Sequence, residues 1–237
     1  PCQSLWTLVY GAHLLMRATR GCFPSTVMTA FLHRILGNQI FMHSEKLLLR
    51  SRAKEQRKKF YNSFSETELL KLQQCISWRV LDFFKFKPSD IIAGYWPKSD
   101  EVDPRPLLEN LSQQKHEIVL PIVNKGNNVL LFRRWTPHSP LKIGLYKNLE
   151  PFENQPTFVP DVLFIPLLNF NKQGHRLGYG GGYYDQTLAA LKKIKTITTI
   201  GLAYDIQHVN QFPIEPHDEA LQWVVTEKKI YNFSEVI

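Results

Sequence analysis

Cysteine is scarce in this 237-residue chain, and its spacing excludes a disulfide framework and a structural zinc site. The three cysteines are an odd number, and no two of them form a C-x-x-C pair. Such usage fits a reducing compartment. Long apolar runs are also missing, because none reaches the roughly 18 to 20 residues that span a bilayer. We therefore expect no association with a membrane.

Acidic residues are absent from residues 1–41, which hold three arginines and an apolar stretch of moderate length. This composition resembles a mitochondrial presequence, but Met28 and Met42 are both plausible starts of a shorter chain. We treat residues 1–41 as an N-terminal extension outside the fold and residues 42–237 as a single α/β domain. The expected location is cytoplasmic, or mitochondrial if the extension acts as a presequence.

The net charge of +8 is a moderate excess of basic residues, and it narrows the range of partners. Such an excess suits either nucleic acid or a polyanionic small ligand. Because no basic repeat is interleaved with aromatic residues, we expect the small ligand and no nucleic acid.

Helical and strand patterns alternate along the rest of the chain. Ser44 can cap a helix over residues 45–60, and Ser65 with Glu68 forms the capping box of the next helix. Further helices are predicted at 104–111 and 183–193, and strands at 90–96, 117–123, 129–134, 159–168, 196–204 and 223–226. The alternation predicts a three-layer α/β fold with a largely parallel sheet and helices on both faces. Residues 136–160, with five prolines, are predicted to form a long surface connection that could act as a flap over a site.

The stretch R-L-G-Y-G-G-G-Y-Y-D at residues 176–185 places four glycines in five positions between a predicted strand and a predicted helix. Missing Cβ atoms let backbone N–H groups approach a ligand at the positive end of the helix dipole, and such a site favours phosphate. Neither common nucleotide motif is present: Tyr183 stands where G-x-G-x-x-G needs its third glycine, and no lysine follows Gly182. The alternative is a tight turn with Tyr183 and Tyr184 in the core.

Pairs of residues for covalent catalysis are not evident, because no Ser-His-Asp order or Cys-His pair stands out. The recurring set is a glycine-rich loop with cations and single carboxylates, which suits a nucleoside triphosphate. Positioning and charge neutralisation supply most of the rate in phosphoryl transfer.

The glycine-rich stretch resembles the signature of the 5-formyltetrahydrofolate cyclo-ligase family, also called methenyltetrahydrofolate synthetases. The resemblance runs in the family's order over about residues 43–229, through K-L-L-L-R at 46–50, E-V-D at 101–103, F-I-P at 164–166, E-P-H-D at 215–218 and V-T-E at 225–227. It implies the NagB/RpiA/CoA-transferase-like fold. It also implies that the domain uses ATP and Mg²⁺ to convert 5-formyltetrahydrofolate into 5,10-methenyltetrahydrofolate, ADP and phosphate. We also expect the protein to be a monomer.

The same resemblance implies the roles of individual residues. The catalytic residues would be Lys46, Arg50 and Arg176. ATP would be bound by these three together with Leu177, Gly178, Tyr179, Gly180, Gly181, Gly182, Tyr183 and Tyr184. The folate would contact Trp96, Glu101, Tyr179 and Tyr183. Mg²⁺ would be held by Asp185 and Asp218.

Each of these residues also has a purely structural interpretation, such as a solvated helix face, a helix-start carboxylate, a turn or a buried aromatic residue. Gly181 departs from the family pattern, since many members carry a lysine there. Two other functions stay open. One is a non-catalytic relative that binds nucleotide or RNA, and the other is a sugar-phosphate isomerase or CoA-transferase relative that binds a phosphorylated ligand without consuming ATP.

Overall fold

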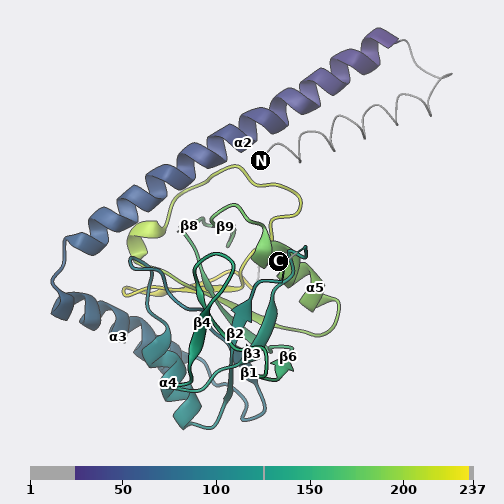
Figure 1. Ribbon diagram of the computed structural model, residues 1–237. Coiled ribbons are helices and arrows are strands. Elements are labelled where there is room, and N and C mark those ends of the chain that lie inside the picture. Colours follow the sequence, from purple (N-terminus) through teal and green to yellow (C-terminus); the bar gives the residue numbers. More distant parts are fainter. Residues whose placement is uncertain (1–24, 125, 235–237) are drawn as a thin grey trace. The chain divides into compact units, whose positions relative to one another are not determined.

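The computed structural model describes residues 25–124 and 126–234 (Figure 1). The chain divides into two compact units, Pro1–Lys46 and Leu47–Ile237, and the boundary falls inside helix α2 (Ser25–Asn62). The predicted helix start after Ser44 is wrong, because α2 already runs from Ser25. Residues 25–44 contain one glycine and no proline, so nothing in their sequence interrupts the helix. Residues 1–24 of the predicted extension lie outside the described residues.

The second unit is built around a sheet that, in the described part of the chain, has eight strands in the order β12-β11-β10-β7-β1-β2-β3-β6. Their bounds are β1 (Ile91–Ala93), β2 (Glu117–Ile122), β3 (Leu131–Arg134), β6 (Thr157–Phe158), β7 (Val162–Pro166), β10 (Thr198–Leu202), β11 (Trp223–Val225) and β12 (Ile230–Asn232). The five neighbours from β11 to β2 are parallel, and β12, β3 and β6 pair antiparallel. The predicted largely parallel sheet is confirmed.

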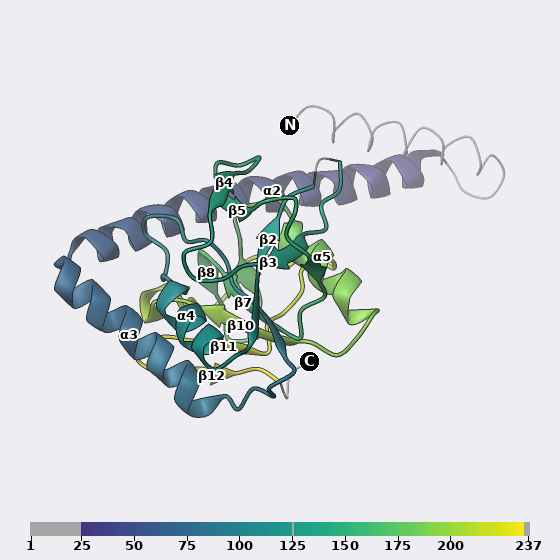
Figure 2. The same cartoon turned by 60° about the horizontal axis from the view of Figure 1, so that its bottom comes forward.

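Helices cover both faces of this sheet, as the sequence predicts. Figure 2 shows α3 (Glu66–Phe83) and α4 (Arg105–Gln113) on one side of the strands and α5 (Tyr183–Lys192) on the other. The core on the α3 and α4 side includes Ile76, Val80, Ile92, Leu107, Leu108, Ile118 and Phe164. The core on the α5 side includes Ala93, Val119, Leu163, Leu188 and Leu191. Successive strand residues alternate between the two cores, so the sheet is buried on both faces.

The capping box of α3 is present as predicted. The hydroxyl of Ser65 accepts a hydrogen bond from the backbone N–H of Glu68, and the carboxylate of Glu68 accepts one from the backbone N–H of Ser65. This reciprocal pair satisfies two N–H groups at the start of the helix and fixes its first turn.

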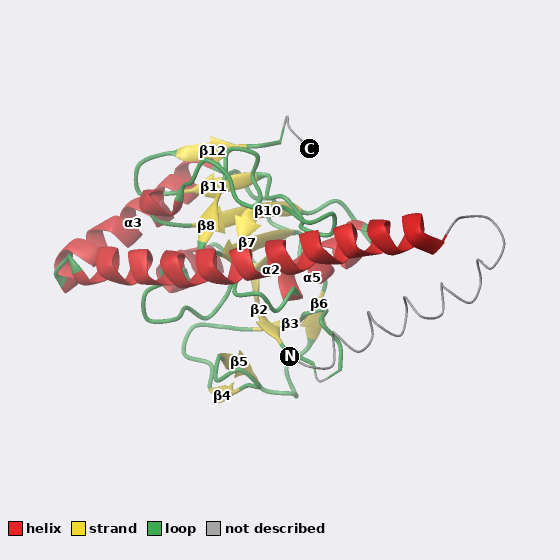
Figure 3. Ribbon diagram, turned by 90° about the horizontal axis from the view of Figure 1, so that it is seen from above, coloured by secondary structure: helices red, strands yellow, loops and turns green. Residues whose placement is uncertain are grey.

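Several short elements were not predicted. The long connection at residues 136–160 contains a hairpin of β4 (Leu141–Ile143) and β5 (Leu149–Pro151), as well as β6. Figure 3 shows this hairpin set apart from the main sheet, beyond β2 and β3. A second hairpin, β8 (Asn169–Phe170) with β9 (Arg176–Leu177), and the short helix η1 (Asp205–Gln207) were also missed. Strands of two or three residues are too short to show a sequence period. Of the helices in residues 25–124 and 126–234, none is both long and apolar enough to cross a membrane.

Leu108 of α4 is fully buried, whereas Leu131 at the start of β3 is 42% exposed. We expect Leu108→Ala to lower the free energy of unfolding by about 2 to 5 kcal/mol, because it removes buried apolar surface and leaves a cavity. Leu131→Ala is the control, with an expected change within about 0.5 kcal/mol. Urea denaturation measures both, and equal losses would contradict this description of the core.

Candidate active site

The glycine loop, residues 178–182, joins β9 to α5 and makes the sharp turn at the start of that helix. Gly180 has φ +97° and Gly182 has φ +68°, a region in which side chains are rarely accommodated. Gly182 is the N-cap residue of α5, so the backbone N–H groups that follow lie at the positive end of the helix dipole. The predicted strand-to-helix loop is confirmed, with the β8–β9 hairpin between it and β7.

Arg50 lies directly against this loop. Its Nε donates a hydrogen bond to the carbonyl oxygen of Gly178 at 3.1 Å. A Cβ at Gly180 would stand only 3.2 Å from the guanidinium carbon. Burial lowers the pKa of Arg50, and the nearby carboxylates of Glu215, Asp218 and Asp185 oppose that shift. A cation predicted to bind phosphate therefore lies beside the predicted phosphate loop.

Arg176 and Asp185 form an internal ion pair behind the loop. Nη2 of the buried Arg176 donates to Oδ1 of Asp185 at 2.7 Å, and Nη1 donates to the carbonyl oxygen of Glu219 at 2.6 Å. The same Oδ1 accepts a hydrogen bond from the backbone N–H of Glu219 at 3.1 Å. Arg176 thus fixes Asp185 and ties α5 to the loop before β11.

Asp218 lies in a group of possible metal ligands that the sequence analysis named only in part. One ligand atom each of Glu215, His217 and Asp218 lies within 4.8 Å of the others. The backbone N–H of Glu215 donates to Oδ2 of Asp218 at 2.8 Å, which fixes the turn. Glu215 and His217 were missed, although they stand in the E-P-H-D stretch quoted for the resemblance.

Glu101 is a buried carboxylate, 5% exposed, in the loop that follows β1. Its Oε1 accepts a hydrogen bond from the hydroxyl of Tyr179 at 2.6 Å, and its Oε2 accepts one from the backbone N–H of Lys98 at 2.8 Å. Tyr179 belongs to the glycine loop, and the Nζ of Lys98 lies 3.8 Å from the centre of its ring. Burial raises the pKa of Tyr179, and the charge of Glu101 raises it further. The predicted folate carboxylate and the predicted ATP loop are therefore joined by one hydrogen bond.

Arg57 was missed by the sequence analysis. It is 2% exposed, and it donates to Asp100, to the carbonyl oxygen of Leu167 and to the hydroxyl of Tyr179. A signal was available, because Arg57 follows Arg50 by two helical turns and so lies on the same face of α2.

Trp96 follows β1 and is half-buried, packed against the core on the α3 and α4 side. The guanidinium carbon of Arg105 lies 5.1 Å from the centre of its ring, and Arg105 is itself paired with Asp103. The proposed contact of Trp96 with folate stays a prediction. The same holds for Lys46, which belongs to the first of the two units.

The two tyrosines at the start of α5 differ in their surroundings. The hydroxyl of Tyr183 is hydrogen bonded to that of Tyr146 at 2.7 Å, and the two rings meet edge to face. Tyr146 lies between β4 and β5, so the predicted flap contacts the first residue of α5, directly after the glycine loop. Burial raises the pKa of Tyr184, and the charge of Glu101 adds to this effect. Tyr184 and Tyr183 also pack against the core on the α5 side, as the structural alternative expected.

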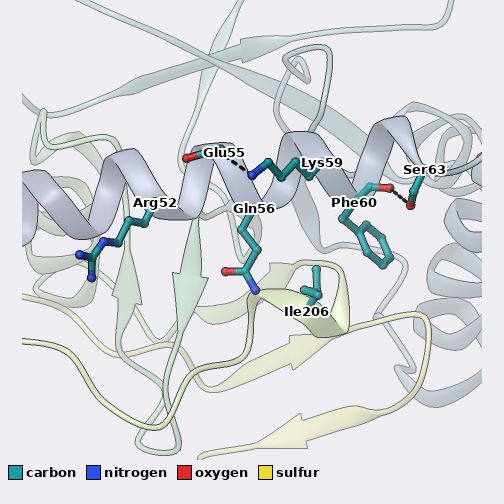
Figure 4. A pocket seen from close by; sticks show the side chains of 7 residues that line it. All are labelled: Arg52, Glu55, Gln56, Lys59, Phe60, Ser63 and Ile206. Carbon is teal, nitrogen blue, oxygen red and sulfur yellow. Dashed lines mark hydrogen bonds and ion pairs between the residues drawn. The ribbon is translucent and has the colours of Figure 1, made fainter.

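A hollow of about 530 Å³ lies along a different side of α2. It is lined by Arg52, Glu55, Gln56, Lys59, Phe60, Ser63 and Ile206. In Figure 4, Gln56 and Phe60 point from the helix towards Ile206 of η1, and Glu55 is paired with Lys59. No residue of the predicted site lines this hollow. Those predicted residues that the structure brings together meet around the glycine loop, which is therefore the candidate active site.

The fold and this arrangement define a three-layer α/β protein with a glycine-rich loop at the start of α5, beside the carboxyl ends of its parallel strands. In such sheets, ligands bind at that edge. The family model of the 5-formyltetrahydrofolate cyclo-ligase family matches residues 42–227, and the chain belongs to this family of enzymes.

Individual relatives agree with this assignment. The chain is 33% identical over 154 residues to the 5-formyltetrahydrofolate cyclo-ligase of Haemophilus influenzae, a match that covers 63% of this chain and 82% of that protein. The match to the Escherichia coli K12 enzyme of the same name is 37% over 149 residues, covering 60% and 80%.

Solved structures give the same result for the fold. The chain resembles the 5,10-methenyltetrahydrofolate synthetase of Aquifex aeolicus with a TM-score of 0.62 and 30% identity, over 78% of this chain and 93% of that one. For the synthetase of Mycoplasma pneumoniae the TM-score is 0.61 and the identity 28%, over 77% and 99%. The resemblance stated from the sequence is confirmed.

Gly181 leaves room for the ring of Tyr183, since a Cβ there would lie 2.8 Å from a ring carbon. We expect Gly181→Ala to displace this ring and break its hydrogen bond to Tyr146. That bond raises the pKa of Tyr183, so the pKa should fall in the variant. NMR titration of ring-labelled tyrosines measures the change.

Gly178→Ala is the matched control, because a Cβ at Gly178 would meet no atom within 4 Å. Its Tyr183 should titrate as in the unmodified protein. An unchanged pKa of Tyr183 in Gly181→Ala would show that the ring adapts without losing Tyr146.

Proposed function

We propose that this protein catalyses the ATP- and Mg²⁺-dependent cyclisation of 5-formyltetrahydrofolate to 5,10-methenyltetrahydrofolate, with release of ADP and phosphate. The observation that carries the proposal is the 2.6 Å hydrogen bond from Tyr179 of the glycine loop to the buried Glu101. This bond places a site suited to phosphate next to a site suited to a ring that donates hydrogen bonds. A reaction between two bound ligands requires such neighbouring sites.

The ATP side consists of the glycine loop and Arg50. Backbone N–H groups at the start of α5 and the guanidinium of Arg50 would bind the phosphates, and Lys46 would add a second cation. Arg176 holds Asp185 in place and would affect nucleotide binding indirectly, because it fixes the conformation of the loop. Leu177, which is buried in β9, anchors the loop at its other end.

The folate side consists of Glu101 and the aromatic residues around it. A carboxylate only accepts hydrogen bonds, so Glu101 suits the ring N–H and amino groups of a pterin. Trp96, Tyr179 and Tyr183 would contact the flat rings of the substrate.

The chemistry proceeds in two steps. The formyl oxygen attacks the γ-phosphorus, the bond to the bridging oxygen breaks, and ADP leaves. N10 then attacks the formyl carbon and loses its proton, while the carbon–oxygen bond breaks and phosphate departs with that oxygen. The protein's residues align the two reactants and exclude water from the activated intermediate.

The donor set beside Arg50 fits Mg²⁺. Glu215, Asp218 and Asp185 offer carboxylate oxygens, which this ion prefers, and their charges act on the same guanidinium. Asp218 and Asp185 would hold the ion, as the sequence analysis expects, and Glu215 would be a third ligand. When bound, Mg²⁺ neutralises phosphate charge as it builds up on the leaving group.

The test is an assay of the full chain with 5-formyltetrahydrofolate, ATP and Mg²⁺, following the near-ultraviolet absorbance of the methenyl product. We expect product only when all three are present. Nucleotide binding without product would instead support the non-catalytic relative, and the proposed reaction would be wrong.

Arg50→Ala should reduce kcat/KM by roughly 100-fold, because a charge that stabilises the transferring phosphate is lost. The circular dichroism spectrum should stay that of the unmodified protein. Arg52→Ala is the control and should keep full activity. Arg52 lies two residues after Arg50 in the same helix but outside the site. Similar rates in the two variants would refute the assignment of Arg50.

Asp218→Asn should raise the Mg²⁺ concentration needed for half-maximal rate by about tenfold, since one anionic ligand is removed. His217→Asn, a neighbour in the same turn, tests whether the imidazole takes part. An unchanged requirement in Asp218→Asn would place the metal elsewhere.

We also propose that residues 42–237 form the single catalytic domain and act as a monomer. The match of the family model from residue 42 onwards supports the first part. Deletion of residues 1–41 should leave kcat/KM unchanged, and light scattering of both chains should give one copy per particle. An inactive truncation with a native circular dichroism spectrum would show that the extension takes part in the reaction.

A further inference from the structure

Arg57 is a buried side chain of α2 that donates four hydrogen bonds. Its Nε and Nη2 each lie 3.0 Å from an oxygen of Asp100, Nη1 lies 3.1 Å from the carbonyl oxygen of Leu167, and Nη2 lies 2.7 Å from the hydroxyl of Tyr179. Burial alone would lower the pKa of Arg57, but the ion pair with Asp100 and the contacts with Tyr179 and Glu101 outweigh it and raise the pKa. The group is therefore a permanently charged, fixed donor.

These contacts join three segments to α2. Asp100 lies in the loop after β1, Leu167 follows β7, and Tyr179 lies in the glycine loop. A planar guanidinium has donors in a rigid fork, so one side chain can hold all three in a fixed relation. Lysine has one nitrogen and cannot reproduce this geometry.

The direction of the Tyr179 hydroxyl follows from these bonds. Arginine has no acceptor, so the phenol oxygen must accept from Nη2 and its single proton must point elsewhere. The hydroxyl donates this proton in a hydrogen bond to Oε1 of Glu101, 2.6 Å away. Nη1 of Arg57 also lies 3.9 Å from the same Oε1, which adds a favourable charge contact.

We propose that Arg57 is a positioning residue, which orients Tyr179 and Glu101 together and so links the order of the glycine loop to binding of the folate. This inference rests on the proposed function, because it takes Glu101 as the carboxylate that binds the substrate. Arg57 is buried and would act on the substrate only indirectly, through the residues that it holds in place. Its loss should therefore affect binding of 5-formyltetrahydrofolate more than the chemical step.

The test is Arg57→Lys in the full chain, with kcat and KM measured for 5-formyltetrahydrofolate and for ATP. We expect KM for the folate to rise about tenfold, the effect of losing one charge-assisted hydrogen bond, while kcat changes by less than about threefold. Arg134→Lys is the matched control. Arg134 makes a similar two-bond pair with Glu117 at 2.7 and 2.6 Å, away from the site, and its replacement should leave KM unchanged.

A merely structural role for Arg57 gives a different result: Arg57→Lys would melt at lower temperature and lose active protein with KM unchanged. That result would overturn the proposal. If Arg57→Lys does not fold, Asp100→Asn serves instead, since it weakens the hold on Arg57 while keeping the guanidinium. It should raise KM for the folate in the same direction by a smaller factor, and an unchanged KM would overturn the proposal.

A double-mutant cycle with Tyr179→Phe tests the route of the effect. If Arg57 acts through Tyr179, the double variant should have a KM no higher than that of the worse single variant. If the two single-variant effects on KM multiply in the double variant, the proposed route is wrong. Absence of ATP-dependent product in the unmodified chain would contradict the proposed function, whereas normal turnover with an unchanged KM in Arg57→Lys would contradict the positioning role alone.

Discussion

A single buried guanidinium, that of Arg57, fixes the relation between the segments that make up the candidate active site. Its contacts run from one helix to the loop after β1, the carboxyl end of β7 and the glycine loop. A buried charge is tolerated only when it is paired and its donors are bonded, and Asp100 with its neighbours meets both conditions. The site is thus built around an ion pair, and its parts depend on one another.

Charge is arranged differently around Arg50, the second arginine of α2 that contacts the glycine loop. Arg50 lies among three carboxylates, Glu215, Asp218 and Asp185, which act on it from the turn before β11 and from α5. A polyphosphate bound there would meet the guanidinium of Arg50 and these carboxylates, whose negative charge a divalent cation would compensate. The arrangement agrees with a ligand that arrives together with its own divalent cation.

Much of the fold follows from its sequence, and the exceptions have physical causes. The central strands, α5 and the capping box of α3 were predicted because apolar runs and caps are local signals. The start of α2 was missed because Ser44 is a good cap residue, yet nothing before it interrupts the helix. The β4–β5 and β8–β9 hairpins are too short for periodicity, and tertiary pairing decides them.

For the site, the glycine loop was predicted from its own residues, and Arg50 and Glu101 were added through the resemblance. The structure brings both of these residues against the loop. Arg57 was not predicted, because a basic residue on a lysine- and arginine-rich helix looks solvated in a sequence. Glu215 and His217 were passed over in favour of Asp218. The spacing from Arg50 places Arg57 on the same face of α2, but only the packing of distant segments shows that its side chain is buried.

The bonds between α2 and the rest of the site span long stretches of sequence: 128 positions from Arg50 to Gly178, and 122 from Arg57 to Tyr179. A contact between residues so far apart in the sequence closes a large loop, and the chain entropy lost in closing it opposes the contact. Contacts of this kind therefore slow folding. During synthesis, α2 emerges long before the glycine loop it must meet. We therefore expect ligand binding to be acquired in a late step of folding, after most of the secondary structure has formed.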